Sequence, residues 1–557
     1  MSRQFLSIAT ACVALGLHTV AQAAFVYTNE APNGVGDVVA LTNALTAFNT
    51  LSDRTNGRIY LKPGVYNLQG VYMDSASHLV LEGGKSGIVF AGLGEGPEDT
   101  ILLGEGEAGG KRVMQSGGGG NFAWLTVSNL TVTGGYTSGN GGGISGSSTT
   151  QYSHLVVSNN YAAGSGSGYG GGGCYYGRAE YCLFADNRVG VAGESVIKVG
   201  GGLWTNGGGG QKDFLVNGAF HCVFTNNWSS LGGGALRLLG KCEDCVFVGN
   251  SAKHGAAVYV TSPTYRWFGD TFTNTTEIAG CSFRSNFLHT AGNGAALYNA
   301  ASPSPIVVSN CTFTANVSEF DGGTAVAYCG SLFDCVVTNN VGGECLLYNC
   351  NLERCVVSGN TARYRGASVD GAASGGAFTN ANCIYANNVM TSYGRVADKK
   401  TLVNCTIVGN VSQNGGNYGY ICTPSCKLVN CILSGNKIGG SMLDIRPIYG
   451  PASSITTNVL DMANCVFVKS QNGVDENWDG LVNCKQVADV KFEDAANGNY
   501  TPKTTSAAYN YGLADEWILE LVGAKDIAGN MRVFGNGLDV GAYESQRWPP
   551  GMILKVW

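Results

Sequence analysis

The hydrophobic and polar positions of this chain repeat a six-residue phrase between residues 182 and 436. The phrase is Cys, any residue, an apolar residue, two small or polar residues and Asn, as in residues 245–250. In an extended strand, the Cys and the apolar residue two positions later point to the same side. Each copy therefore predicts a short strand with one buried face. Ten copies begin at Cys182, Cys222, Cys245, Cys281, Cys311, Cys335, Cys355, Cys383, Cys405 and Cys431, and two weaker copies without the Asn begin at Cys465 and Cys484.

The spacing between copies is never shorter than 19 residues and varies only upward. This pattern is typical of a solenoid, in which coils of about 20 to 25 residues stack and insertions leave as loops. Stacking aligns the Cys, the apolar residue and the Asn into three internal ladders. At the end of its strand, the Asn either caps backbone groups of the turn or tolerates a left-handed conformation.

A second phrase, glycine followed by small and then apolar residues, falls between the Cys phrases. It reads at residues 233–236, 255–258, 294–297, 323–326 and 375–378. Glycine is needed where φ is positive or where another backbone comes close, so the phrase predicts a tight bend that enters another strand. Two or three short parallel strands per repeat predict an all-β fold, a right-handed parallel β-helix. The alternation of the two phrases over roughly residues 125–490 resembles polymorphic outer membrane proteins and the pectate-lyase-like superfamily.

Both ends of the chain predict capping elements. Apolar residues at helical spacing within residues 34–50 follow Asp37, a plausible N-cap, and predict a helix that closes the first coil. The following stretch, residues 57–66, resembles the opening coil of secreted β-helix proteins. In the early coils, Leu125, Leu130 and Leu155 occupy the position that Cys takes later.

The C-terminal region resembles another group of proteins. The pattern Asp526-x-x-Gly-x-x-Arg532, followed by Asp539-x-Gly-Ala-Tyr-Glu544, resembles bacterial surface β-helix proteins with a choice-of-anchor Q domain. We expect its charges to pair and hold a cap together, with a cation or sugar site as the alternative. The expected parts are a signal peptide (1–23), an N-terminal cap (24–56), the β-helix (57–490), a C-terminal β cap (491–545) and a tail (546–557).

Composition and charge agree with one folded, repetitive unit. Glycine makes up 84 of 557 residues, and charged residues 13% against a usual ~25%. With hydrophobic residues at 44%, the chain is not disordered. The net charge of −6 argues against nucleic acid as a partner. We expect a monomer.

Residues 1–23 predict export. Arg3, an apolar core and Ala21-Gln22-Ala23 have the order of a secretory signal peptide, although a lipoprotein signal ending at Cys12 is an alternative. No later stretch has the ~20 apolar residues of a membrane span. The expected location is secreted or at the cell surface, on the outer membrane exterior.

The cysteines are expected to be buried free thiols. Stacked residues of adjacent coils lie about 4.7–4.9 Å apart with parallel side chains, whereas a disulfide needs converging Cβ atoms about 3.5–4.5 Å apart. Outside the ladder, the sequence does not decide whether Cys422 and Cys426 form a disulfide. Cys242-x-x-Cys245 resembles half a zinc site but has no second ligand pair, so we expect no metal there.

Catalytic residues are not evident. Hydrolysis of a glycosidic bond needs two carboxylates, and a lyase needs a base and a group that neutralises a uronate carboxylate. The nearest candidates lie in two insertions, and scattered surface charges explain them equally well. These candidates are Arg363, Arg365 and Asp370 in one insertion, and Glu243, Asp244, Arg266 and Asp270 around the other.

Aromatic residues assigned to the insertions suggest a binding face instead. Aromatic rings stack on the apolar faces of sugars, although the same residues could cover the outer sheet or pack loops. We expect an adhesion, glycan-binding or structural display protein without catalysis, whose partner is an extracellular polysaccharide or a cell-surface component. The alternative is a polysaccharide lyase or glycoside hydrolase. No cofactor is expected for a binding protein. Ca²⁺ is expected only if the chain is a lyase. The candidate glycan-binding residues are Tyr175, Tyr176, Trp204, Trp228, Tyr265 and Trp267.

Overall fold

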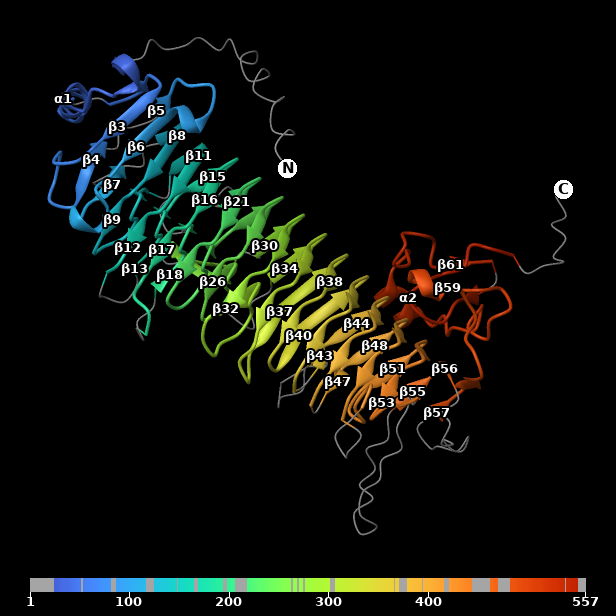
Figure 1. Ribbon diagram of the computed structural model, residues 1–557. Helices are drawn as coiled ribbons and strands as arrows, with labels where there is room; N and C mark the ends of the chain where they lie inside the picture. The colour runs from blue at the N-terminus through green and yellow to red at the C-terminus, as the bar shows by residue number, and fades with distance from the viewer. Residues whose placement is uncertain are drawn as a thin grey trace, which may run out of the picture. The chain divides into compact units, whose positions relative to one another are not determined.

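The computed structural model divides the chain into two compact units. Unit 1 comprises residues 1–251 and 263–274, and unit 2 comprises residues 252–262 and 275–557. The structure describes residues 25–548 except 52–53, 82–86, 117–124, 148, 165–168, 194–197, 206–217, 262–263, 268–269, 274–275, 301–305, 365, 370–377, 393, 415–419, 443–460, 469–480 and 536. Each unit is a right-handed parallel β-helix, as the repeat predicts (Figure 1).

The predicted helix follows the first strand of unit 1. In α1 (Val38–Asn49) the Asp37 carboxylate accepts a hydrogen bond from the Ala40 N–H at 2.9 Å, and Leu41, Leu45 and Phe48 are fully buried. The helix therefore covers the first coils, which end the solenoid at this side. Those coils are built from β1 (Val26–Asn29), β2 (Arg58–Leu61), β3 (Gly64–Asn67), β4 (Ser77–Leu81), β5 (Ile88–Gly92), β6 (Thr100–Leu103), β7 (Arg112–Ser116) and β8 (Leu125–Thr133).

The later coils of unit 1 contain four recurring kinds of strand, each paired in parallel with its counterpart in the next coil, and one further pair, β13 (Tyr169–Gly170) with β18 (Lys198–Val199). Strands after the glycine bend are β10 (Ile144–Ser145), β14 (Cys174–Tyr175), β19 (Leu203–Trp204) and β23 (Leu236–Leu238). Strands before the Cys position are β11 (Thr150–Ser158, which also continues past it), β15 (Arg178–Glu180), β20 (Gly218–Phe220) and β24 (Lys241–Glu243). Strands after the Cys are β16 (Leu183–Ala185), β21 (Val223–Thr225) and β25 (Val246–Val248), and strands around the Asn ladder are β9 (Tyr136–Thr137), β12 (Tyr161–Ala162), β17 (Arg188–Val189) and β22 (Trp228–Ser229).

Unit 2 repeats this plan. Strands after the glycine bend are β27 (Val258–Val260), β33 (Leu297–Asn299), β37 (Thr324–Phe333), β40 (Cys345–Glu353), β43 (Gly366–Val369) and β47 (Arg395–Asp398). Strands before the Cys are β30 (Thr276–Ala279), β34 (Ile306–Ser309), β44 (Thr379–Ala381), β48 (Thr401–Val403), β51 (Lys427–Val429), β55 (Asp461–Ala463) and β57 (Leu481–Val482). Strands after it are β31 (Ser282–Arg284), β35 (Thr312–Thr314), β38 (Val336–Thr338), β41 (Val356–Ser358), β45 (Ile384–Ala386), β49 (Thr406–Val408), β52 (Ile432–Ser434), β56 (Val466–Val468) and β58 (Lys485–Val487). Strands after the Asn are β32 (Phe287–Leu288), β36 (Val317–Ser318), β39 (Val341–Gly342), β42 (Thr361–Ala362), β46 (Val389–Met390), β50 (Val411–Ser412) and β53 (Lys437–Ile438).

The three predicted ladders form the interior of both units. Apolar rings stack in register, with Phe184, Phe224 and Phe247 separated by 4.9 and 5.0 Å between centroids. In the Asn ladder, Asn316 donates from its backbone N–H and its Nδ2 to the side-chain oxygen of Asn340, at 2.8 and 3.0 Å. The Asn thus caps backbone groups, one of the two expected roles. Positive φ falls instead on the residue before it, as at Asn339 with φ 57°.

The cysteines are separate thiols throughout the described part of the chain, and all of these except Cys484 are buried. In the ladder, the Cys222 N–H contacts Cys245 Sγ at 3.4 Å. Burial raises the pKa of the Cys222 thiol, so it stays neutral. The open Cys422–Cys426 bridge is not formed: Cys426 Sγ lies 3.5 Å from the Ala397 carbonyl oxygen instead.

The leucine part of the Cys ladder is confirmed at two positions and wrong at the third. Leu130 pairs with Leu155, whose N–H lies 3.5 Å from Cys182 Sγ. Leu125 pairs with Thr150, at the start of the preceding strand segment. The error arises because β8 runs through a corner at Asn129 (φ 53°), so one strand carries residues of two faces.

The C-terminal module, residues 491–548, contains two short hairpins and a helix that the sequence did not predict. The hairpins are β59 (Phe492–Asp494) with β60 (Asn499–Pro502) and β61 (Val533–Phe534) with β62 (Gly537–Leu538), and the helix is α2 (Glu516–Val522). Ile518 and Val522 of α2 pack on Ala381, Val403 and Val429, which face outward from coils of unit 2. Neither described helix has the length and hydropathy of a membrane span.

Candidate functional site

Four tyrosines of unit 2 stand in one outward column. Tyr259, Tyr298, Tyr328 and Tyr348 are direct register partners on β27, β33, β37 and β40. Their ring centroids are 5.4, 5.1 and 4.9 Å apart in that order, and all four side chains are half-buried. We call these residues the tyrosine column. It presents one ring per coil along four successive coils.

The glycine phrase places the first two tyrosines of this column. Gly255 and Gly294 adopt φ of 52° and 67°, and Tyr259 and Tyr298 follow each of them by four residues. A Cβ at Gly255 would lie 2.3 Å from the Val258 carbonyl oxygen, so only glycine makes this bend. The strand that leaves the bend alternates inward and outward, with Val258 fully buried and Tyr259 pointing out.

The stacking of the rings determines which parts of the tyrosine side chains a ligand can contact. Tyr298 and Tyr328 have a ring on both sides, so neighbouring tyrosines cover much of their faces. Part of each side chain remains on the outside, since all four tyrosines are half-buried. Aromatic edges carry the positive part of the ring quadrupole, and a phenol both donates and accepts hydrogen bonds. The column therefore suits an oxygen-rich ligand that spans several coils.

His254 adds a defined hydrogen-bond donor to the column. Its ring lies 4.9 Å from the Tyr298 ring, and its Nδ1 accepts a hydrogen bond from the Asn293 N–H at 3.1 Å. The neutral ring then carries its proton on Nε2. Burial, with a smaller effect from Lys253, lowers the pKa of His254 to about 4. His254 is thus a neutral imidazole at physiological pH.

The predicted glycan-binding residues of unit 1 separate into two groups. Tyr175 stacks on Tyr176 with 3.8 Å between centroids, and Trp204 meets these rings edge-on at 5.0 and 6.0 Å. Tyr175 and Trp204 were expected in insertions, and this expectation is wrong. They follow Gly171 and Gly200 by four residues on β14 and β19, the same position relative to the bend as in the tyrosine column.

Packing limits what this cluster can bind directly. Trp204 is only 7% exposed, and the Arg237 guanidinium covers its ring at 3.8 Å from the centroid. Trp204 therefore fits the alternative role of covering the outer sheet. Tyr175 and Tyr176 remain half-buried.

The other predicted residues lie apart from this cluster. Trp228 is on β22, beside Arg188. Tyr265 and Trp267 belong to β28 (Thr264–Trp267), which forms an antiparallel hairpin with β29 (Asp270–Thr273), and their side chains lie outside the described part of the structure.

The predicted charged candidates form no common catalytic site among the described residues. Arg363 pairs with Asp321 at 3.0 Å, and Asp244 lies 3.6 Å from His221 Nδ1. Glu243 is on β24. Arg365 and Asp370, and the side chains of Arg266 and Asp270, lie outside the described residues. No group of three or more His, Cys, Asp or Glu side chains within the described ranges is placed to hold a metal ion.

The charges of the C-terminal module are buried inside it. Asp526, Arg532, Asp539 and Glu544 are each at most 1% exposed. Asp526 accepts hydrogen bonds from the Ala528 and Asn530 N–H groups at 2.9 and 2.7 Å, and Arg532 donates to the Gly541 carbonyl. These side chains hold the module together through backbone groups, and no ion pair joins the four residues in the described structure, so the expected pairing of the charges with one another is not seen. The resemblance to choice-of-anchor Q proteins stays a prediction.

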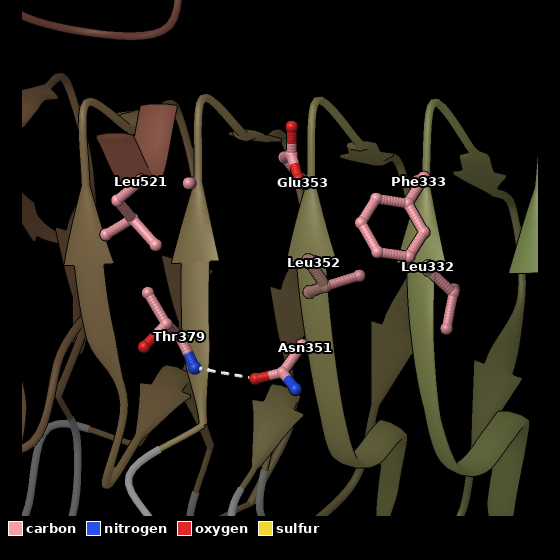
Figure 2. Close-up of a pocket in the computed structure, with 8 residues that line it drawn as sticks. Leu332, Phe333, Asn351, Leu352, Glu353, Thr379 and Leu521 are labelled. Atoms are coloured by element: carbon pink, nitrogen blue, oxygen red, sulfur yellow. Dashed lines mark hydrogen bonds between the residues drawn. The ribbon is translucent and has the colours of Figure 1, made fainter. Parts of the chain in front are cut away.

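A cleft of about 250 Å³ lies where α2 meets the outer face of unit 2. Figure 2 shows Phe333, Leu352 and Leu521 on its apolar walls and Glu353 beside them. The Thr379 N–H donates to the Asn351 side-chain oxygen at 2.9 Å. The Glu353 carboxylate is already paired with Arg354, so the cleft offers mainly apolar contact.

Comparison with known proteins gives similarity to solved structures alone. No protein-family model and no curated protein matches the sequence. The A-module of the Azotobacter vinelandii mannuronan C-5 epimerase AlgE4 is 13% identical over 64% of this chain and 91% of that chain, with a TM-score of 0.32. A mannuronic acid specific polysaccharide family 6 lyase from human gut microbiota is 11% identical over 83% and 90%, with a TM-score of 0.33. Pectate lyase Pel9A is 13% identical over 94% and 97%, with a TM-score of 0.22. Similarity at this level does not carry an activity over to this chain.

Proposed function

We propose that this chain binds an extracellular polysaccharide along the tyrosine column. The single observation that supports the proposal is the regular placement of four half-exposed tyrosines on four successive coils of one unit. Each coil repeats the same outward position, so a polymer with repeated hydroxyl groups can make the same contact several times. Repetition gives useful affinity even when each contact is weak.

The chemistry of the column favours sugars over apolar ligands. Phenol groups at Tyr298 and Tyr328, together with the Nε2–H of His254, form a row of hydrogen-bond donors. Sugar hydroxyls and uronate carboxylates are acceptors for such donors. An apolar polymer could not make such hydrogen bonds.

Binding to a panel of polymers tests this proposal. Calorimetry would compare polygalacturonate, polymannuronate and a neutral glucan with the wild-type chain and with the double variant Y298A/Y328A. We expect the double variant to lose at least about tenfold in affinity for the polymer that binds best, because two adjacent contacts are removed. The variant Y298F/Y328F, which keeps the rings, should lose less.

A matched control is available in unit 1. Tyr72 is 48% exposed and lies outside the column, so Y72A should bind as the wild type does. Unchanged affinity in Y298A/Y328A, with intact folding by circular dichroism, would refute the proposal.

A second candidate function is cleavage of the bound polymer, and His254 is the observation that favours it. A neutral imidazole with its proton on Nε2, next to a phenol, can donate a hydrogen bond or a proton to a substrate oxygen. Release of new reducing ends covers both lyases and hydrolases. Turnover that disappears in H254A while affinity remains would establish catalysis, and silence across the panel, with and without Ca²⁺, would exclude it for those polymers.

Export is part of the proposal because the ligand is extracellular. Residues 1–23, which carry the predicted signal peptide, lie outside the described residues. N-terminal sequencing of the protein recovered outside the cell should begin at Ala24 if the predicted cleavage is right.

A further inference from the structure

A second outward column in unit 1 follows the Asn ladder. Its members are Tyr136, Tyr161, Arg188 and Trp228, in register on β9, β12, β17 and β22. The Arg188 guanidinium carbon lies 5.1 Å from the Tyr161 ring centroid and 4.5 Å from the Trp228 ring centroid. Two aromatic rings therefore hold one cation between them. We call these four residues the arginine column.

Among the described residues, the fold does not use the N–H donors of this guanidinium. Arg188 is exposed, and in the described part of the chain its side chain has no hydrogen-bond acceptor and no carboxylate within ion-pair distance. Asp186, two residues earlier, is also exposed and forms no ion pair with it. A guanidinium has five N–H donors in a rigid, planar fork. Its ring neighbours fix that plane and leave the edges of the fork open.

The β-helix does not require this composition at this position. In unit 2, the residue after the ladder Asn is Phe287, Val317, Val341, Thr361, Val389, Val411 and Lys437 on successive coils. Five of these seven residues are small and β-branched, so such residues satisfy the same short strand. An Arg between two aromatic rings is therefore a local departure that folding does not explain, and such departures are expected at functional sites.

We propose that the arginine column binds a carboxylate group of an acidic polysaccharide. A planar guanidinium matches a carboxylate with two parallel hydrogen bonds. Since Tyr161 and Trp228 already order the Arg188 side chain, less conformational entropy is lost on binding. The edges of the two rings add contact for the sugar that carries the carboxylate. This inference rests on the proposed polysaccharide ligand, but it assigns a separate site on different residues.

The experiment compares polygalacturonate with its methyl ester, which lacks the charge. Affinity would be measured by calorimetry for the wild type, R188A, R188K and W228A. We expect R188A to weaken binding of polygalacturonate about tenfold and to leave binding of the ester unchanged, because one charge-assisted pair is lost. R188K keeps the charge without the fork and should recover only part of the affinity. W228A should also weaken binding, since Arg188 is then no longer held.

A matched control is R284A, which removes an exposed arginine from unit 2 outside both columns. It should bind polygalacturonate as the wild type does, and its thermal unfolding gives the reference for R188A. An equal loss for acid and ester, or no loss in R188A, would overturn the inference. Equal binding of dextran sulfate with the same loss in R188A would make this a general anion site and overturn the carboxylate assignment.

The two proposals fail in different ways. If Y298A/Y328A abolishes binding and R188A does not change it, polysaccharide binding stands and the arginine column has no part in it. If R188A alone abolishes binding, the tyrosine column is the wrong site.

Discussion

Asn430 and Leu513 exchange two hydrogen bonds across 83 residues of sequence. The Asn430 side-chain oxygen accepts from the Leu513 N–H at 2.8 Å, and its Nδ2 donates to the Leu513 carbonyl at 2.8 Å. Asn382 likewise donates to the Val522 carbonyl at 2.7 Å, and the Asn404 oxygen accepts from Arg532 Nε at 2.9 Å. These asparagines stand directly before Cys383, Cys405 and Cys431, so one corner of the coils holds the C-terminal module.

Replacing Asn430 should loosen that module. We expect N430A to lower the free energy of unfolding by about 2 kcal/mol, because it leaves the Leu513 N–H and carbonyl without partners. Urea unfolding followed by circular dichroism would measure it. N310A is a matched control, since Asn310 has nearly the same φ (53° against 52°) but is exposed at the same corner. Equal losses in both variants would mean that backbone strain, not docking, sets the cost.

The Asn ladder should be more costly to break in its middle. Asn340 is fully buried, accepts from Asn316 twice, and donates to the Phe313 carbonyl at 2.9 Å. We expect N340A to cost about 3 kcal/mol of unfolding free energy, because buried donors of the neighbouring coil lose their acceptor. In contrast, N339G, at the exposed residue with φ 57°, should change stability by no more than about 0.5 kcal/mol. If N340A changes the free energy of unfolding in urea only slightly, the hydrogen bonds of the Asn ladder do not stabilise the coils as predicted.

Local periodicity explains what the sequence could predict. The Cys, apolar and Asn positions recur because each coil stacks on the previous one, and the Asp37 cap follows from neighbouring residues. The tyrosine column was missed for a related reason. The glycine phrase predicted a bend and a strand, but the outward position four residues after the bend glycine was not followed along the chain. This position is Tyr175, Trp204, Arg237, Tyr259 and Tyr298 on successive coils.

The remaining features depend on contacts that no local pattern contains. Asn382 and Val522 are separated by 140 residues, so the site of docking of α2 could not be inferred from either segment. Arg188 and Trp228 are a different case, because each directly follows a ladder Asn (Asn187 and Asn227), so the predicted ladder already places them on neighbouring coils. Sequence reasoning placed Trp228 among the aromatics but did not follow the position after the Asn from coil to coil.

Thiol labelling should separate the end of the Cys ladder from its interior. Cys484 is the described cysteine that is not buried, whereas Cys245 and Cys281 are at most 1% exposed. We expect iodoacetamide to modify Cys484 first in the native protein, because buried neutral thiols react poorly. Peptide mapping by mass spectrometry reports each cysteine separately. Modification of Cys245 as fast as Cys484 would show that the coils open readily, and unfolding in urea should equalise all rates.

The buried carboxylates of the C-terminal module should make stability depend on pH. Burial, and then the nearby Asp539, raise the pKa of Glu544 from 4.5 to about 9, so the folded chain keeps a proton that the unfolded chain releases. The stabilisation is complete below pH 4.5 and is lost as pH rises toward 9. Asp539, whose pKa burial raises to about 6, acts with the same sign at lower pH. Between about pH 6 and 9, the free energy of unfolding should therefore fall in the wild type, by up to about 1.4 kcal/mol per pH unit, and stay flatter in E544Q. The exposed E516Q variant should retain the wild-type slope, and equal slopes in E544Q and wild type would show that Glu544 is ionised in the folded protein.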